Sequence, residues 1–398
     1  MKLALVADTF PPFRTSGAVQ LRDLTREIVR QGHELTVLLP DSSLKSAWVL
    51  DSYHGAQILR LKAPPIKDIG YVRRVIGEIL MPYAMRKNLR KSPLAAENWE
   101  GVIWYSPSIF HGPFVKTLKQ KGRSKGYLII RDIFPDWAVD LGLMRRGPAY
   151  HFFAKIARTQ YAVADIIGVQ TSGNLPYFSK WQLKYPERVL EVLPNWLDHA
   201  TDTHCSIRVD QTALAGKTVF VYAGNMGIAQ GMGIVIDLAA RMATRPDVGF
   251  LFVGRGTEVQ TLKDKARALD LKNVLFFDEI NPDEIPDLYA QCHAGIVALD
   301  PRHKSHNIPG KFLTYMRSGL PVLANVNPGN DLAALIRREN VGEVCESNRL
   351  EDLEKNCISL VEKLEVDPEY STRCADLFSK NFAVQQTVAR LVAQLGRA

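Results

Sequence analysis

The 398-residue chain lacks any apolar run approaching the roughly 20 residues that a membrane-spanning helix needs. Its five cysteines are scattered, odd in number and free of C-x-x-C spacing, which favours a reducing cytoplasm and argues against structural zinc. No D-x-D pair and no histidine cluster indicates a metal site. We expect no signal peptide either, because Asp8 interrupts the first apolar run and no small-residue cleavage site follows. With 46% hydrophobic and 23% charged residues, the composition is that of an ordinary globular protein.

Positive charge is in excess, with a formal net charge of +8, and it is unevenly distributed. Residues 60–91 hold nine lysines and arginines against Asp68 and Glu78, and apolar residues lie between the charges. This pattern suits peripheral contact with an anionic membrane surface. A solvated amphipathic helix packed on its own domain would give the same pattern. Nucleic acid is not expected, because no recognised nucleic-acid module accompanies the basic segment.

Strand-like and helix-like segments alternate through both halves of the chain. This alternation predicts parallel sheets covered by helices on both faces, and the length of the chain favours two domains. A polar stretch without periodicity, residues 198–214, is the best linker. We therefore predict an α/β fold of two doubly wound, Rossmann-like domains facing across a cleft. They cover residues 1–197 and 215–375, and a C-terminal helix (376–398) could pack back on the N-terminal domain.

The most informative segment is residues 218–233, TVFVYAGNMGIAQGMG. A β-branched and aromatic run stops at Gly224, glycines recur at 227, 231 and 233, and a helical pattern follows. A strand that ends in a glycine turn before a helix is a phosphate-binding arrangement, because backbone N–H groups and the helix dipole attract anions. In doubly wound sheets, ligands bind at the carboxyl ends of the strands, so this turn should face the cleft.

Several motifs occur in an informative order: LVADTFPPFRTSGAVQ, RDIFP, VLPNWLD, VYAGNMGIAQG, FLFVGRGTE and NIPGKFLTYMRSGLPVLA. In this order and spacing the chain resembles glycosyltransferase family 4, which comprises retaining enzymes of the two-Rossmann type called GT-B. Within that family it is most similar to bacterial transferases of O-antigen or capsule synthesis. The resemblance extends over nearly the whole chain.

The resemblance implies that the C-terminal half binds a UDP-sugar donor and the N-terminal half binds the acceptor. The implied activity is hexosyl transfer with retention, without metal or cofactor, to a lipid-linked or saccharide acceptor in lipopolysaccharide synthesis. An N-acetylated hexosamine and a deoxyhexosamine are candidate sugars. Such an enzyme would work in the cytoplasm, peripherally on the inner face of the plasma membrane. Two alternatives stay open: a UDP-sugar epimerase of the same fold, and a non-catalytic nucleotide-sugar-binding protein.

Three residues of the N-terminal half are candidates for the site. By the resemblance, Gly17 lets its loop approach the donor phosphate, although a plain strand-to-helix turn is the alternative. Arg131 and Asp132 stand where the family commonly has a histidine. Asp132 could accept the proton of the acceptor hydroxyl and Arg131 could hold a phosphate. A strand-end ion pair, or Asp132 capping the next turn, is the alternative interpretation.

In the glycine loop, Asn225 and Gln230 occupy positions where many family members place Arg and Lys. The diphosphate leaving group would then depend on backbone N–H groups, on the helix dipole and on a cation from elsewhere. Lys311, in a P-G-K element at the head of a helix, is the best candidate for that cation, because lysine there is unfavourable unless an anion is present. A surface lysine is the alternative, and Arg255 and Arg302 are fallback cations.

An E-x7-E glutamate pair that recurs in the family is absent. Its two positions fall on His306 and Thr314. Thr314 could hydrogen-bond the ribose more weakly than a carboxylate would, His306 could contact the sugar, and Glu279 is a candidate compensating carboxylate. The catalytic candidates are thus Asp132, Arg131 and Lys311, and the donor-binding candidates are Gly17, Gly224, Asn225, Gly227, Gln230, Gly254, Arg255, Glu279, His306, Pro309, Gly310 and Thr314.

Overall fold

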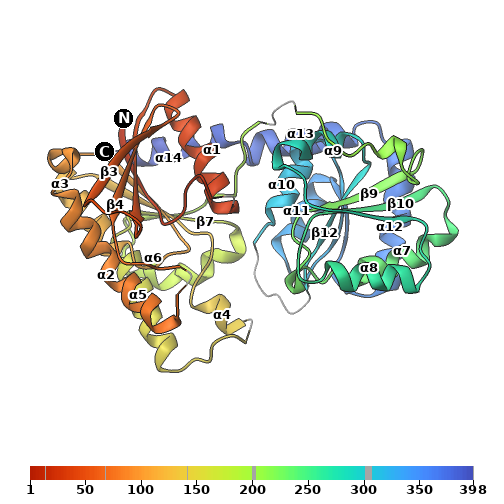
Figure 1. Ribbon diagram of the computed structural model, residues 1–398, viewed down its shortest axis with the longest axis horizontal. Coiled ribbons are helices and arrows are strands. Elements are labelled where there is room, and N and C mark those ends of the chain that lie inside the picture. The colour runs from red at the N-terminus through yellow and green to blue at the C-terminus, as the bar shows by residue number, and fades with distance from the viewer. Residues whose placement is uncertain (14, 68, 141, 200–202, 301–306, 398) are drawn as a thin grey trace. The chain divides into compact units, whose positions relative to one another are not determined.

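The computed structural model describes residues 1–13, 15–67, 69–140, 142–199, 203–300 and 307–397. The chain forms two compact units: Met1–Asp198 together with Val384–Ala398, and His199–Ala383 (Figure 1). Each unit has a sheet of mainly parallel strands with helices on both faces. The predicted fold class, two doubly wound α/β domains, is confirmed.

The first unit is built on an eight-stranded sheet in the order β3-β4-β2-β1-β5-β6-β7-β8. All neighbouring strands are parallel except β3 and β4, which form an antiparallel hairpin at one edge. The chain runs outward from β1 on one side and returns to β5 on the other, so the strand order reverses between β1 and β5. The strands are β1 (Lys2–Val6), β2 (Glu34–Asp41), β3 (Trp48–Tyr53), β4 (Ala56–Lys62), β5 (Gly101–Tyr105), β6 (Lys125–Ile129), β7 (Ile166–Val169) and β8 (Val189–Val192).

Two apolar cores cover the two faces of this sheet. Leu3 and Leu5 of β1 pack in one core with α1 and α14, and Ala4 and Val6 pack in the other with α2, α3 and α5 (Figure 1). Alternate residues of a strand point to opposite faces, so a central strand buried on both sides is continuously apolar. The helices are α1 (Ser16–Arg30), α2 (Tyr71–Leu89), α3 (Gly112–Gly122), α4 (Asp136–Asp140), α5 (Pro148–Tyr161), α6 (Ser179–Lys184) and α14 (Val384–Gly396).

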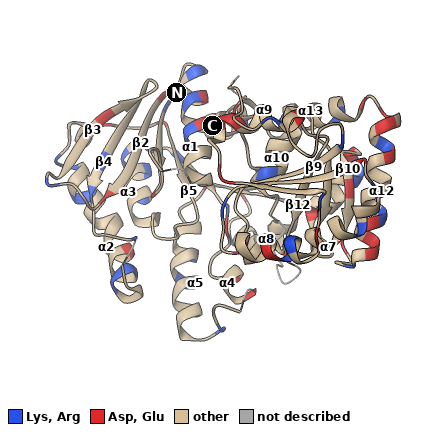
Figure 2. Ribbon diagram, turned by 45° about the vertical axis from the view of Figure 1, so that its right-hand side comes forward, with Lys and Arg blue, Asp and Glu red and all other residues tan. Residues whose placement is uncertain are grey.

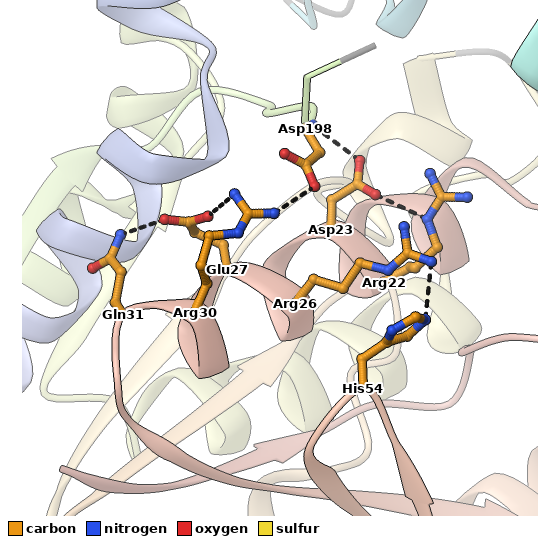
Figure 3. Close-up of polar contacts among 8 residues, drawn as sticks. All are labelled: Arg22, Asp23, Arg26, Glu27, Arg30, Gln31, His54 and Asp198. Carbon is orange, nitrogen blue, oxygen red and sulfur yellow. Dashed lines mark hydrogen bonds and ion pairs between the residues drawn. The ribbon is translucent and has the colours of Figure 1, made fainter. Parts of the chain in front are cut away.

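A polar network on α1 holds the end of the first unit in place (Figure 3). The buried carboxylate of Asp23 accepts a hydrogen bond of 3.1 Å from the backbone N–H of Asp198. Arg30 binds the buried Glu27 at 2.6 Å and the Asp198 carboxylate at 3.2 Å. Gln31 donates to the second oxygen of Glu27 at 2.7 Å. These partners allow two carboxylates to be buried, which would otherwise be costly.

The second unit has a six-stranded parallel sheet in the order β11-β10-β9-β12-β13-β14. Its central strand β9 comes first in the chain, and the order reverses between β9 and β12, where doubly wound folds bind their ligands. The strands are β9 (Thr218–Ala223), β10 (Val248–Val253), β11 (Val274–Phe277), β12 (Ala294–Ala298), β13 (Val322–Asn325) and β14 (Gly342–Cys345). The helices are α7 (Gly233–Arg241), α8 (Val259–Ala268), α9 (Ile285–Ala290), α10 (Gly310–Arg317), α11 (Asp331–Glu339), α12 (Leu350–Val366) and α13 (Tyr370–Asn381).

The structure differs from the sequence-based expectations in three places. The hairpin strand β3 was not expected. The C-terminal tail, predicted as one helix, is broken between α13 and α14, and the two residues at the break, Phe382 and Ala383, are buried. The segment expected to be a linker packs on the second unit, starting at Cys205. The backbone N–H of Cys205 donates to Asp287 at 2.7 Å, and Leu214 is buried in the same unit. No helix in the described ranges is long and apolar enough to cross a membrane.

Candidate functional site

Two glycine turns lie against each other at the carboxyl ends of β9 and β10. Gly224 and Gly254 have φ angles of 137° and 143°, which disfavour side chains. A Cβ atom on Gly254 would lie 2.1 Å from the carbonyl oxygen of Gly224, so the two backbones touch. The N–H of Met226 donates to the carbonyl of Arg255 at 2.7 Å and joins the turns. Only glycine allows this close approach, which joins the turns that follow β9 and β10.

The side chains of Asn225 and Gln230 fold back onto the glycine loop. The Gln230 carbonyl oxygen accepts from the N–H of Gly227 at 2.9 Å and from the Asn225 amide at 3.4 Å. The Gly227 N–H is therefore already used, contrary to the expectation of a fully open cradle. In the described part of the chain, the N–H groups of Ile228 and Ala229 bind no acceptor, and α7 begins without a side-chain cap. These N–H groups can therefore donate hydrogen bonds to a bound anion.

Lys311 lies at this glycine loop, as the sequence predicted. It is the second residue of α10, which follows Pro309 and begins at Gly310 without a side-chain cap. Its Nζ lies 2.6 Å from the Tyr222 hydroxyl, and a Cβ on Gly224 would lie 3.6 Å from Nζ. No carboxylate of the described residues forms an ion pair with Lys311, and burial lowers its pKa to about 7. An anion bound here would restore the charged form.

The other residues of the second unit that were candidates for binding the sugar donor are partly engaged in contacts within the protein. Arg255 and Glu279 form an ion pair of 3.3 Å at the surface, beside the glycine turns. Thr314 lies one turn along α10, and its hydroxyl donates to the Gly310 carbonyl at 3.2 Å. That hydroxyl can still accept a hydrogen bond but has no free proton to donate. His306 and Arg302 lie outside the described residues.

Gly17 is the second residue of α1, which begins at Ser16. Thr15 caps the helix by accepting from the N–H of Ala18 at 3.3 Å. A Cβ on Gly17 would lie 3.3 Å from Thr9 and 3.4 Å from the ring of Tyr105, which is tighter than usual contact. Glycine at this position therefore has a packing reason within the first unit, independent of any ligand.

Arg131 and Asp132 follow β6, but the structure gives them different surroundings. The guanidinium of Arg131 is buried, donates to the carbonyls of Leu193 and Pro194 at 3.0 and 3.4 Å, and lies 4.5 Å from the Trp196 ring centroid. Burial lowers its pKa. Its contacts fix the segment after β8, and this arrangement does not favour the expected phosphate contact. Asp132 is exposed to solvent at the surface, yet partial desolvation by the surrounding protein raises its pKa, while the charge of Arg131 opposes the shift.

The described residues contain no group of three or more histidine, cysteine, aspartate or glutamate side chains placed to hold a metal ion.

The second unit offers three kinds of group that can bind an anion, all at one place: backbone N–H groups, two helix N-termini and the Lys311 ammonium. This chemistry suits a diphosphate, whose negative charge grows when it departs as a leaving group.

Known proteins resemble this chain in sequence and in fold. A family model described as glycosyl transferases group 1 matches residues 206–375, which hold the glycine turns and Lys311. Residues 206–375 thus form a group 1 glycosyltransferase domain. WbjE of Pseudomonas aeruginosa, named as a glycosyltransferase, is 24% identical over 230 residues, which is 56% of each chain. WcaI of Escherichia coli K12, whose name refers to colanic acid biosynthesis, is 23% identical over 372 residues, covering 87% of this chain and 86% of WcaI.

The fold of this glycosyltransferase is also that of solved GT-B structures. The structure of HepE from Anabaena, in complex with UDP and glucose, superposes with a TM-score of 0.68 over 99% of this chain and 100% of HepE, at 16% identity. At this identity the likeness establishes the fold alone.

Two residues of the glycosyltransferase were missed by sequence reasoning. Tyr222, the fifth residue of β9, contacts Lys311, and Tyr105 contacts Gly17 and donates to the side chain of Gln20 at 2.7 Å. Both tyrosines lie inside apolar strand runs and look like core residues. Their position could have indicated a role in the site, because each lies at or next to the carboxyl end of a central strand, beside a predicted glycine turn.

Proposed function

We propose that this glycosyltransferase moves a sugar from a UDP-sugar to a lipid-linked or saccharide acceptor during synthesis of a cell-surface polysaccharide, with retention of anomeric configuration. The observation that carries the proposal is Lys311 beside the glycine turns at the point where the strand order of the second unit reverses. The UDP in the HepE structure and the colanic acid pathway in the name of WcaI support the donor class and the product class.

Leaving-group stabilisation would supply most of the catalysis. As the bond between sugar and phosphate breaks, charge develops on the UDP oxygens, and donors already in place stabilise it without reorganisation. The N–H groups of Ile228 and Ala229 and the ammonium of Lys311 are such donors. Asp132, with its raised pKa, is the candidate for accepting the proton of the acceptor hydroxyl or for orienting the acceptor.

A donor panel tests this proposal. Purified protein is incubated with UDP-, GDP- and dTDP-sugars and lipid-linked acceptors, and both transfer and release of the nucleoside diphosphate are followed. We expect transfer from a UDP-sugar only. Lys311→Ala should reduce kcat by about 10²–10³, the usual loss when one leaving-group donor is removed. Lys272→Ala removes an exposed lysine of the same unit, paired with Asp270, and should leave the rate unchanged.

Three outcomes would contradict the proposal. Binding of UDP-sugars without transfer to any acceptor would favour a non-catalytic binding protein. Interconversion of free UDP-sugars would establish an epimerase. Transfer at the wild-type rate by the Lys311→Ala variant would remove Lys311 from the mechanism.

The first unit also carries a surface suited to a lipid-linked acceptor. Along α2, five large apolar side chains are about half exposed or more: Tyr71, Val72, Ile76, Leu80 and Tyr83. The opposite side of the same helix, including Met81, is buried, so α2 is apolar on both its inner and its outer side. The same helix carries Arg73 and Arg74 near its start and Arg86 and Lys87 near its end (Figure 2). We propose that the exposed apolar side chains lie on an anionic membrane, because apolar contact and positive charge together favour that surface.

Vesicle co-sedimentation tests the membrane contact. We expect binding to vesicles that contain phosphatidylglycerol, weak binding to neutral vesicles, and loss of binding as salt shortens the range of the electrostatic attraction. The double variant Ile76→Ser, Leu80→Ser should bind several-fold more weakly. Leu183→Ser, which alters an exposed leucine on α6, is the matched control. Failure of the wild-type protein to bind anionic vesicles would refute the contact.

A further inference from the structure

A buried tyrosine connects the candidate cation to the glycine loop. Tyr222 lies near the end of β9, and its side chain is fully buried in the core that the sheet forms with α7 and α12. Its hydroxyl lies 2.6 Å from Nζ of Lys311 and 2.6 Å from the backbone carbonyl oxygen of Asn225. One hydroxyl group thus joins α10 to the loop that follows β9.

The direction of both hydrogen bonds follows from the chemistry of the groups. A protonated lysine has only donors, and a carbonyl oxygen only accepts. The Lys311 ammonium must therefore donate to the tyrosine oxygen, and the single hydroxyl proton must be donated to the Asn225 carbonyl. A neutral Lys311 would offer a lone pair instead, so the hydroxyl proton could turn away from the loop. The protonation of Lys311 therefore affects the hydrogen bond that Tyr222 makes to the loop.

We propose that Tyr222 is the positioning residue of the donor site, holding the Lys311 ammonium against the glycine loop where a nucleoside diphosphate binds. The inference rests on the proposed function for the identity of the ligand. The Nζ atom also lies 3.8 Å from the centroid of the Tyr222 ring, so the aromatic face adds electrostatic attraction to the same cation.

The titration of the two groups is consistent with this role. Burial lowers the pKa of Lys311 to about 7, so the lysine is only partly charged near neutral pH in the ligand-free protein. Burial raises the pKa of Tyr222, so its hydroxyl keeps its proton throughout. Binding of a diphosphate should therefore protonate Lys311 while Tyr222 stays in place as the acceptor.

Tyr315 provides a matched control in the same core. It is fully buried, and its single hydroxyl proton is shared between the backbone carbonyls of Val221 and Ile296, at oxygen–oxygen distances of 3.0 and 3.2 Å. Within the described residues, this hydroxyl forms no hydrogen bond with Lys311. Tyr222→Phe and Tyr315→Phe each remove one buried hydroxyl and keep the ring. A general loss of stability should affect both variants, whereas loss of cation positioning should affect only Tyr222→Phe.

Calorimetric titration with UDP is the first test. At pH 7 we expect Tyr222→Phe to weaken UDP binding by about 10-fold, the usual effect of removing one hydrogen bond to a charged group, and Tyr315→Phe to change it by less than about 2-fold. In a Lys311→Ala background, Tyr222→Phe should have almost no further effect. An equal loss from Tyr222→Phe with and without Lys311, or no loss at all, would overturn the proposal.

Chemical labelling of lysines supplies a second test that needs no ligand. The reactivity of Lys311 toward acetic anhydride, measured by mass spectrometry between pH 5.5 and 9, reports its titration. We expect a midpoint near pH 7 in the wild type and in Tyr315→Phe, and a lower midpoint in Tyr222→Phe, because the ammonium loses its acceptor. An unchanged midpoint would overturn the positioning role. If no nucleoside diphosphate binds the wild type, the proposed function fails, and this midpoint still decides the role of Tyr222.

Discussion

Donor binding should depend on pH through Lys311. Its pKa is about 7 in the ligand-free protein because of burial, and a bound diphosphate should raise that pKa by several units. At and above neutral pH, UDP binding should then be accompanied by protonation of Lys311. Affinity for UDP should therefore fall as pH rises above 7.

The size of this effect follows from the protonated fraction of Lys311. With a pKa of about 7, that fraction falls from about 0.8 at pH 6.5 to about 0.03 at pH 8.5, a change of roughly 25-fold. This change alone should weaken UDP affinity by the same factor, equivalent to about 1.9 kcal/mol. The terminal phosphate of UDP titrates near pH 6, so about a quarter of free UDP is still protonated at pH 6.5, which reduces the expected overall fall in affinity to about 20-fold.

Isothermal titration calorimetry in buffers of different ionisation enthalpy measures both the affinity and the number of protons taken up. The wild type should take up about one proton per UDP at pH 8.5 and almost none at pH 6.5, where uptake by Lys311 and release by UDP nearly cancel. The Lys311→Met variant should bind UDP more weakly with a flat pH profile. If the wild-type affinity is constant from pH 6.5 to 8.5, or if Lys311→Met keeps the wild-type slope, the account of Lys311 is wrong.

Three further predictions concern stability and the glycine turns. Lys311→Met should raise the free energy of unfolding of the ligand-free protein by about 1–2 kcal/mol at pH 6, and by less at pH 9. The gain is larger at pH 6 because the pKa of Lys311 is lower in the folded than in the unfolded protein, so wild-type stability rises with pH between about 7 and 10.5. Equal gains at both pH values in urea titrations would contradict this prediction. Gly254→Ala should cost at least about 2 kcal/mol and abolish UDP binding, because its φ is 143° and the new Cβ would meet the Gly224 carbonyl. Gly310→Ala has open space and should stay within about 0.5 kcal/mol, and equal effects of the two alanines would refute the account of the turns. Arg131→Met should cost about 2–4 kcal/mol in thermal unfolding, because two backbone carbonyls lose their donor, yet leave UDP affinity unchanged; weakened UDP binding in a folded Arg131→Met protein would restore the phosphate role.

The fold could be predicted from the sequence because its signals are local. Central strands such as β1 and β9 are continuously apolar, and each is followed by a glycine-containing segment and a helical pattern. Lys311 could be placed near the glycine loop because the carboxyl ends of neighbouring parallel strands share one edge of the sheet. The ordered motifs then indicated the family, which the comparisons confirm.

What could not be predicted depends on tertiary contacts. The sequence shows that Arg131 follows a buried strand but not that the guanidinium turns inward to the carbonyls of Leu193 and Pro194, which lie more than sixty residues away. Gln230 looked like a ligand contact, yet its carbonyl oxygen caps the Gly227 N–H. Tyr222 resembles any apolar strand residue until α10 brings Lys311 to its hydroxyl. Periodicity and spacing carry no information on such long-range pairings.

The central claim is that this protein transfers the sugar of a UDP-sugar and that Lys311 stabilises UDP as the leaving group. The most direct measurement follows a UDP-sugar labelled with ¹³C at the anomeric carbon by NMR, with a lipid-linked acceptor, in the wild type and in Lys311→Ala. We predict that the anomeric signal moves to a glycoside of the same configuration as UDP accumulates, and that the variant is slower by about 10²–10³. Inversion of configuration, free sugar as the only product, or equal rates in the two proteins would contradict the account.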